Sequence, residues 1–470
     1  MLLVVWLACL VAVITATPSI PPELYSPLIT QKLLAVAQNV SNPLQYPEYT
    51  TPPPYGDEIG RWQYFPTDTW TNGFFPASLA LLAERAQKCP AAQLISSSDA
   101  ATALSQARTW SAPLVTLETG SDLGHDVGFI SFPFQEDLRM DPSNATAQAA
   151  ADAFAAFLAG RFSSVVGCTR SWDVSTPDYF EVIIDNMINI DIFFLSADSS
   201  GNSTAYHEMA ISHADKTMQN HVRADGSTFH LVIYNSTDGS VIAQKTAQGY
   251  ADNSTWTRGQ GWAMYGFTSM YNRTGLSRYL DTARHVSQFY VDHLPTGNSV
   301  PPWDFDAPTS PTPPRDTSSA TLASSAMLLL SRIEASLGNS TGSAYWVDKA
   351  VTLLADTVSV AWRTESQWQA LLSNGTSSYN KGVYDTGLTY GDYYFIEAGN
   401  ILLDMGLANC TSNSGAATPT CATGCGSTLE ATVSQRTSEA GPRLQISYGL
   451  TLPSLASITN VMLLALFSMY

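Results

Sequence analysis

In one stretch of the chain, polar and aromatic residues lead directly into an apolar stripe with helical spacing. Residues 252–267 read Asp-Asn-Ser-Thr-Trp-Thr-Arg-Gly-Gln-Gly-Trp-Ala-Met-Tyr-Gly-Phe. If Thr257 or a neighbour caps a helix, Trp262, Tyr265 and Phe267 share one face, because residues three to four apart lie on the same side of a helix. The pattern therefore predicts a helix that begins near Thr257 and buries its aromatic face.

The same layout recurs in five other stretches, each with polar, aromatic or glycine residues just before or at the start of an apolar run. These stretches are 70–82, 125–129, 184–197, 315–330 and 390–398, and helix-like segments between them include 149–158, 206–222, 278–293 and 345–362. Six units of two helices predict an all-α fold, an (α/α)6 toroid or barrel of six helical hairpins. Six inner helices then run the same way, so that the six polar segments meet on one rim.

The ends of the chain differ in composition from its body. An apolar run that ends in small residues predicts a signal peptide over 1–17, although it lacks a basic start. We expect one folded domain over 18–408 and a flexible stalk, rich in Ser, Thr and Gly, over 409–447. The hydrophobic tail 448–470 is typical of a GPI-anchor signal, with a plain membrane anchor as the alternative. These features predict an extracellular protein and leave its attachment to the cell surface open.

Nine Asn-x-Ser/Thr triplets are consistent with a secreted glycoprotein, because this triplet is the acceptor for N-glycosylation. We expect no glycan on Asn253, since it would stand on the predicted rim. The acceptors are Asn39, Asn144, Asn202, Asn235, Asn253, Asn272, Asn339, Asn374 and Asn409.

The six cysteines also fit an oxidising compartment. With Cys9 in the signal peptide, Cys89 and Cys168 form the expected disulfide of the body. Two of the three later cysteines are expected to pair as well: Cys410, Cys421 and Cys425. No Cys/His spacing resembles a zinc site, and we expect neither a metal nor another cofactor.

The formal net charge is −18, from 22 Lys and Arg against 40 Asp and Glu. This charge argues against nucleic acid as a partner and against long-range attraction of an anionic ligand. Helix N-termini that converge on one rim nevertheless provide local positive potential, to which Arg258 adds a full charge. A carboxylate can therefore still bind at that rim.

Two tryptophans flank Arg258 at the predicted helix start, namely Trp256 and Trp262. A guanidinium between two indoles suits a sugar acid, because the rings stack on the sugar while the guanidinium bonds its carboxylate. Nearby glycines would let the ligand approach the backbone. The alternative is a helix start whose tryptophans belong to the core.

Several longer motifs follow one another in a fixed order. They are His-Asp at 125–126, Ile-Asp-Asn-Met at 184–187, Gln-Gly-Tyr at 248–250, Trp-Thr-Arg-Gly-Gln-Gly-Trp at 256–262, Pro-Trp-Asp-Phe-Asp-Ala-Pro at 302–308, Asp-Thr-Ser-Ser-Ala at 316–320 and Tyr-Gly-Asp-Tyr-Tyr at 390–394. Together they resemble the unsaturated glucuronyl hydrolases of glycoside hydrolase family 88, as a secreted, fungal-type member. The resemblance covers nearly all of the body but not the tail.

This resemblance implies an (α/α)6 barrel and an enzyme that removes a 4,5-unsaturated uronic acid from the non-reducing end of oligosaccharides left by polysaccharide lyases. An acid protonates C4 of the double bond, water adds at C5, and the hemiketal opens and expels the aglycone. Asp185 resembles the family's catalytic acid/base and Asp126 its second essential carboxylate. Burial and a like-charged neighbour would both favour the protonated acid that this step needs. The alternatives are an N-cap role for Asp185 and, for Asp126, a cap or a structural pair with His125.

The resemblance also assigns residues that hold the sugar. A satisfied strand or loop histidine is the alternative for one of them, His230. We expect Gln260 to orient its neighbours and Asp191 to be structural, whereas Asp392 could serve equally as a cap or a contact. The expected binding residues are Trp70, His230, Gln248, Trp256, Arg258 and Trp262.

Other functions stay open. Ala247 stands where a histidine often precedes Gln-Gly-Tyr in the family, which leaves the substrate open, sulfated uronates above all. The sibling unsaturated rhamnogalacturonyl hydrolases share fold and reaction, but Gln260 favours the glucuronyl interpretation. A conventional inverting glycosidase would need a second carboxylate roughly 6.5–9.5 Å from the first. A surface carbohydrate-binding protein without catalysis is the third class. The sequence indicates no particular oligomeric state.

Overall fold

The computed structural model describes residues 19–410, apart from 39–40, 42–43, 54–55, 90–93, 120–121 and 201–202. The predicted signal peptide, hydrophobic tail and nearly all of the stalk lie outside these residues. Within them, no helix combines the length and the apolar character needed to cross a membrane.

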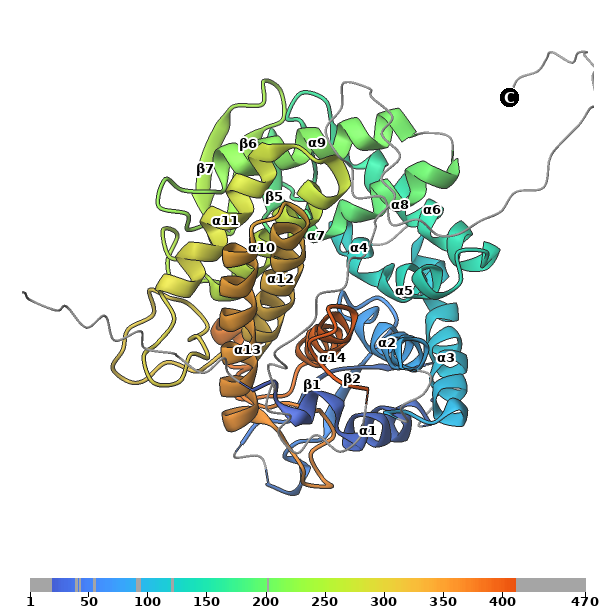
Figure 1. Ribbon diagram of the computed structural model, residues 1–470. Helices are drawn as coiled ribbons and strands as arrows, with labels where there is room; N and C mark the ends of the chain where they lie inside the picture. The colour runs from blue at the N-terminus through green and yellow to red at the C-terminus, as the bar shows by residue number, and fades with distance from the viewer. Residues whose placement is uncertain are drawn as a thin grey trace, which may run out of the picture. The chain divides into compact units, whose positions relative to one another are not determined.

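Across the described residues the helices form a double ring (Figure 1). Each inner helix packs on its ring neighbours, and α14 closes the ring against α2. The inner helices are α2 (Phe74–Lys88), α4 with α5 (Val127–Ile130 and Phe132–Met140), α7 with α8 (Asn186–Asn189 and Asp191–Ser200), α10 (Thr257–Thr274), α12 (Thr317–Ser336) and α14 (Thr389–Asp404). The outer helices are α1 (Pro27–Ala37), α3 (Ser97–Ser111), α6 (Ala145–Gly160), α9 (Ser203–Asn220), α11 (Ser277–Asp292) and α13 (Ser340–Ala361).

Burial explains which helices are inside. The inner helix α12 is buried on nearly every side, whereas the outer helix α11 buries one stripe and exposes the other. The helices expected at 149–158, 206–222, 278–293 and 345–362 are the observed α6, α9, α11 and α13. The predicted (α/α)6 barrel is therefore confirmed.

Three small antiparallel sheets, which the sequence did not predict, stand beside the helices. The strands are β1 (Tyr46–Thr50) with β2 (Trp62–Phe65), β3 (Phe162–Ser163) with β4 (Cys168–Thr169), and β5 (Tyr179–Ile183) with β6 (Leu231–Asn235) and β7 (Val241–Lys245). Short 3-10 helices are η1 (Pro22–Tyr25), η2 (Gly56–Glu58), η3 (Ala112–Leu117), η4 (Gly124–Asp126) and η5 (Tyr379–Lys381).

Aromatic side chains pack together where the inner helices face one another. The ring centroids of Phe74 and Phe132 are 5.2 Å apart, those of Phe129 and Trp262 5.3 Å, and those of Trp262 and Tyr394 5.7 Å. Such edge-on and tilted pairs stabilise an aromatic core beyond the area they bury. The predicted inward face of α10 is therefore part of this core.

The predicted disulfide is wrong. Cys89 pairs with Cys410, which joins the end of α2 to the end of the described chain. Cys168 lies in β4 as a buried free thiol, and burial raises its pKa. The oxidising compartment and the number of cysteines suggested a disulfide between Cys89 and Cys168. Which cysteines lie close together depends on the packing of α14 against α2, and the spacing of cysteines in the sequence does not reveal this packing.

Buried carboxyl groups make stability depend on pH. Burial raises the pKa of Glu397, on α14, to about 7 and that of Glu48, on β1, also to about 7. As pH rises above about 4.5, the unfolded chain loses these protons first, so stability falls until the folded groups titrate. We expect the melting temperature to be higher at about pH 5 than at about pH 7.5, by roughly 5 °C. Glu397→Gln should reduce this difference in melting temperature between the two pH values. A melting temperature of the wild type that is higher at about pH 7.5 than at about pH 5 would contradict the prediction.

Candidate functional site

The sheet formed by β5, β6 and β7 brings Asp185 and His230 together. Ile183, the last residue of β5, pairs with Leu231, the first of β6, and the amide of Ile184 donates to the carbonyl of His230 at 2.9 Å. The residue that follows β5 and the one that precedes β6 are therefore neighbours. His230 Nε2 lies 3.5 Å from Asp185 Oδ2.

Asp126 reaches the same place from the next inner helix pair. It ends η4 and precedes α4, which packs against α7 at Gly128, where an added Cβ would stand 2.3 Å from the Cβ of Asn189. Only glycine permits this approach. Burial and the charge of Asp185 raise the pKa of Asp126 well above its ordinary range. The two carboxyls thus interact, as predicted.

Both aspartates stand at helix starts without capping them. Asp126 precedes α4 and Asp185 precedes α7, and neither side chain accepts a capping hydrogen bond. Asp185 is 7% exposed, and its Oδ2 has no hydrogen-bond partner. The interpretation of these residues as N-caps is therefore wrong, and the free carboxylate atoms remain available for chemistry.

Two buried histidines face the aspartates with a fixed tautomer. Asn189 Nδ2 donates to the carbonyl of His125 at 2.9 Å, and the same nitrogen is 2.8 Å from His125 Nδ1. A carbonyl can only accept, so the Asn189 atom is the amide nitrogen and His125 Nδ1 must accept too. His230 Nδ1 likewise accepts from the amide of Ala247 at 3.0 Å. In their neutral forms, both rings therefore carry hydrogen on Nε2.

The Nε2 atoms of both rings lie near the carboxylates without forming a hydrogen bond to them. His125 Nε2 lies 3.4 Å from Asp126 Oδ1, and His230 Nε2 lies 3.5 Å from Asp185 Oδ2. Burial lowers the pKa of His125 to about 3, and a second proton on Nδ1 would also break its bond with Asn189. His125 is thus neutral at neutral pH and carries no second proton for an acid step.

Asn189 is expected to act on the reaction through this tautomer. Asn189→Asp keeps the size of the side chain but turns the donor into an acceptor, which moves the hydrogen of His125 to Nδ1. We expect kcat to fall by about 10-fold or more and the pH dependence of kcat/KM to shift, as wrong-tautomer variants of other histidine sites do. A variant that folds with an unchanged rate and pH profile would contradict this role.

Aromatic rings continue from His230 around the site. The His230 and Trp256 rings are 4.9 Å apart, the Arg258 guanidinium lies 4.6 Å from the Trp256 ring and 5.1 Å from that of Tyr390, and Tyr390 is 5.2 Å from Trp70. The structure therefore brings four of the six expected binding residues into one row of contacts. The prediction that Arg258 lies between two indoles is wrong, because the second ring beside it is that of Tyr390.

Arg258 is already occupied by protein partners. Its Nη1 is 2.6 Å from Asp316 Oδ2 and donates to the carbonyl of Thr376 at 2.6 Å, while Nη2 donates to that of Ser377 at 2.8 Å. Arg258 is 2% exposed, and only Nε has no hydrogen-bond partner. This arrangement favours a role in positioning the wall of the site over the predicted grip on a carboxylate.

The remaining expected binding residues differ in depth. Trp262 is fully buried among the aromatic core residues, and its Nε1–H has no acceptor. Gln248 is half-buried with an unpaired Oε1, next to Ala247, whose amide holds His230. Ala247 makes this bond through its backbone amide, so the bond does not depend on the side chain at 247.

Three further polar residues serve the fold. Gln260 bonds Thr228 and the carbonyls of Gly226 and Val286, which agrees with its expected orienting role. Asp191 binds Ser269 and Arg273 and is structural, as predicted. Asp392 lies inside α14 and accepts from the amides of Leu371 and Leu372, so its expected role as a cap is wrong, and it serves the fold by holding this loop.

Sequence reasoning missed three residues of this region. Asn189 and Asp316 are partners of His125 and Arg258, and only the fold reveals such partnerships. The motif at 184–187 ends just before Asn189, which could have signalled it. Glu48 lies close enough to Tyr390 for its charge to act on the phenol, yet nothing in its short strand marked it.

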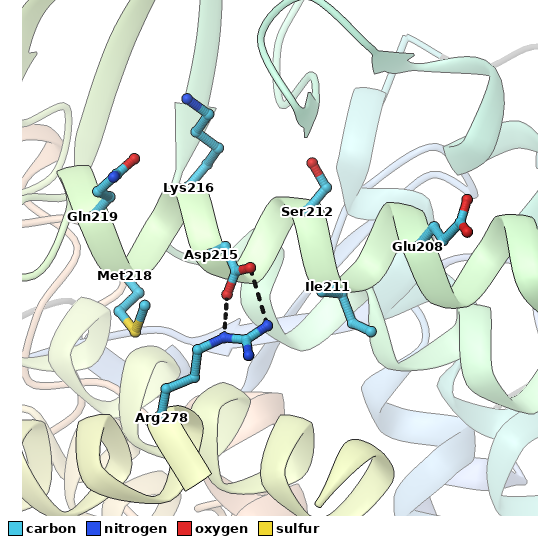
Figure 2. A pocket seen from close by; sticks show the side chains of 8 residues that line it. All are labelled: Glu208, Ile211, Ser212, Asp215, Lys216, Met218, Gln219 and Arg278. Atoms are coloured by element: carbon cyan, nitrogen blue, oxygen red, sulfur yellow. Dashed lines mark hydrogen bonds and ion pairs between the residues drawn. The ribbon is translucent and has the colours of Figure 1, made fainter. Parts of the chain in front are cut away.

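One surface hollow lies away from these residues. Figure 2 shows it on the outer helix α9, with Asp215 paired to Arg278 at the start of α11. It contains none of the predicted site residues. Among the described residues, no group of three His, Cys, Asp or Glu side chains is arranged to hold a metal ion.

Comparison with known proteins decides the family. An unsaturated glucuronyl hydrolase from Formosa agariphila is 34% identical over 340 residues, which cover 71% of this chain and 80% of that protein. The chain belongs to the unsaturated glucuronyl hydrolase family. It is accordingly a glycoside hydrolase, and the family indicated by its motifs is confirmed.

Other members of the unsaturated glucuronyl hydrolase family match with lower identity. An unsaturated chondroitin disaccharide hydrolase from Streptococcus pyogenes is 26% identical over 379 residues, covering 79% of this chain and 90% of that protein. The crystal structure of an unsaturated glucuronyl hydrolase specific for heparin has a TM-score of 0.72 at 26% identity, with 83% of this chain and 99% of that one covered. No protein-family model matches the chain.

Proposed function

We propose that the protein removes a 4,5-unsaturated uronic acid from the non-reducing end of lyase-generated oligosaccharides by hydrating the C4=C5 double bond. The observation that carries this proposal is the pair of neighbouring carboxyls, Asp126 and Asp185, which have a histidine Nε2 at 3.4 and 3.5 Å, respectively. Burial and the charge of Asp185 raise the pKa of Asp126, which favours retention of a proton at this site, as general acid catalysis requires.

In this proposal Asp185 gives its proton to C4 and then, as carboxylate, takes one from the water that adds at C5. The hemiketal at C5 opens by breaking its bond to the ring oxygen. The hemiacetal left at C1 expels the aglycone as an alcohol. The sum is one water consumed, one keto uronate and one shortened sugar formed, and Asp185 ends protonated again.

Binding of the uronate is assigned to the ring of residues around the pair. Trp70 and Trp256 provide aromatic walls for the sugar. Polar atoms without protein partners, Trp262 Nε1 and Gln248 Oε1, are the proposed contacts for its hydroxyls, while Arg258 holds the wall of the site. The relatives act on chondroitin disaccharides or are specific for heparin, so glycosaminoglycan fragments are the first candidates for the parent polysaccharide.

The test is a panel of lyase-generated disaccharides, with the ultraviolet absorbance of the conjugated double bond followed over time. We expect the absorbance to disappear with at least one glycosaminoglycan fragment and the reducing-end sugar to be released in equal amount. Binding without turnover of any fragment would instead support a carbohydrate-binding protein.

We also propose that the protein is extracellular, on the strength of the apolar segment 1–17 and the N-glycosylation triplets. The fungal-type character rests on the sequence alone, since the relatives named above are bacterial. Expression of the full chain in a eukaryotic host should place it in the medium or on the cell surface, where phospholipase release would identify a GPI anchor. Retention inside the cell would contradict the proposal.

A further inference from the structure

One arginine outside the predicted site lies close to the segment that carries Asp126. Arg161 directly follows the last residue of α6, and its side chain is only 13% exposed. The short helix η4 begins at Gly124, two residues before Asp126, and a Cβ at this glycine would stand 3.4 Å from Arg161 Nη2. Gly124 has a φ of +63°, and its Cβ would also clash with the carbonyl oxygen of Ser171. Only glycine therefore fits where η4 passes the arginine.

Ser171 joins the two segments that bear the carboxyls. Its carbonyl accepts from the amide of His125, the residue before Asp126, at 3.1 Å. Its hydroxyl accepts from the amide of Ile183, two residues before Asp185, at 2.9 Å. A shift of the loop around Ser171 would therefore move both aspartates.

Arg161 holds this loop at three points. Its Nε donates to the carbonyl of Arg170 at 3.0 Å and its Nη2 to that of Ser171 at 3.4 Å. Its Nη1 lies 2.8 Å from Asp173 Oδ2. The backbone adds a fourth bond, from the amide of Arg170 to the carbonyl of Arg161 at 3.0 Å. The side chain thus fixes residues 170–173 as one unit.

Arg161 also brings a positive charge to the carboxyl pair. Burial and the charge of Asp185 raise the pKa of Asp126, and the charge of Arg161 opposes this rise. A nearby cation favours the carboxylate form, because it stabilises the negative charge. Burial lowers the pKa of His125 to about 3 and that of His221 to about 4, so both rings are neutral at neutral pH. The titratable and charged groups near the pair are His125 of η4, His230 before β6, His221 after α9, Arg161 after α6, and Arg258 of α10, which is paired with Asp316.

We propose that Arg161 is a positioning residue that holds the two carboxyls in place and, through its charge, sets the pH range over which the pair keeps the proton for the acid step. The inference rests on the proposed function, which needs this proton at C4. Arginine suits both tasks, because its guanidinium stays charged at any working pH and its planar fork bonds several acceptors at once. A lysine would supply the charge without the three bonds.

The test is the pH dependence of kcat/KM for an unsaturated disaccharide, measured at low ionic strength, where charges are least screened. A general acid works only while it is protonated, so loss of its proton appears as the alkaline limb of this profile. Arg161→Met removes the cation, and the pair should then keep its proton to higher pH. We expect the alkaline limb to move up by roughly 0.5–1 pH unit. Arg161→Lys, which keeps the charge, should move it by less than half as much.

Arg170→Met is the matched control. Arg170 lies in the same loop and pairs with the same Asp173, but its guanidinium stands over the Phe180 ring, 4.7 Å from the centroid. Its loss should leave the alkaline limb in place. A purely structural role of Arg161 would lower kcat/KM equally at every pH. An unmoved limb in Arg161→Met would therefore overturn the inference while the proposed function stands.

Asp173→Asn decides the matter if Arg161→Met does not fold. The Asp173 side chain is 64% exposed, so its replacement should leave the fold intact. Arg161 then loses the anion that offsets its charge, and we expect the alkaline limb to move to lower pH, by less than in Arg161→Met. A limb that stays in place or moves up would overturn the inference. If the wild type does not turn over the disaccharide, the proposed function fails, and the inference fails with it.

Discussion

Asp185→Asn is expected to lower kcat by about 10²- to 10⁴-fold while substrate binding is largely kept. The amide has nearly the same shape but holds no transferable proton, so the double bond is not protonated at C4. His230 Nε2–H, 3.5 Å from Asp185 Oδ2, can still face the amide oxygen, which keeps the local structure. Turnover is measured from the loss of ultraviolet absorbance, and binding by calorimetry with the same unsaturated disaccharide.

Asp191→Asn is the matched control for this variant. Asp191 begins α8, six positions after Asp185, and its carboxylate is bound to Ser269 and Arg273. Its loss should lower the melting temperature and leave kcat close to that of the wild type. If Asp185→Asn keeps most of its rate, the assignment of the acid is wrong.

Arg258→Ala is expected to destabilise the protein by about 3–5 kcal/mol, because it leaves the fully buried Asp316 without its counter-ion. It also releases the carbonyls of Thr376 and Ser377, and with them this wall of the site. Unfolding by denaturant gives the loss of free energy. Activity should fall because the wall of the site is no longer held.

Arg273→Ala removes an arginine from the same helix, α10, whose ion pair with Asp191 is partly exposed. It should cost about 1 kcal/mol or less. The double variant Arg258→Ala/Asp316→Ala should be more stable than Arg258→Ala alone, since no unpaired charge remains buried. A large rise in KM with unchanged stability would contradict the positioning role and return Arg258 to direct recognition of the uronate.

The repeated switch from polar residues to apolar stripes was enough to predict the barrel. It works because every inner helix must begin at the polar rim and continue into a closed core, so each unit repeats the same pattern. The pattern also placed Asp126 and Asp185 at helix starts on one rim. The capping alternative could only be rejected from coordinates, because a cap and a catalytic acid look alike in sequence.

What the sequence could not provide were the partners of these residues. The pairing of Cys89 with Cys410 and the ion pair of Arg258 with Asp316 join segments far apart in the chain. The antiparallel pairing of β5 with β6 sets Asp185 beside His230. This pairing depends on the register of the two strands, which the short apolar run before Asp185 does not specify. Local sequence patterns were therefore enough to predict the helices, whereas the contacts between side chains depend on the tertiary structure.

The most direct test of the hydration mechanism uses two disaccharides that differ only in the C4=C5 double bond. With the wild-type protein, we predict that the unsaturated one loses its absorbance and releases its reducing-end sugar, whereas the saturated one is left intact. Cleavage of the saturated disaccharide at a comparable rate would show direct attack at the anomeric carbon and contradict the role given to Asp185.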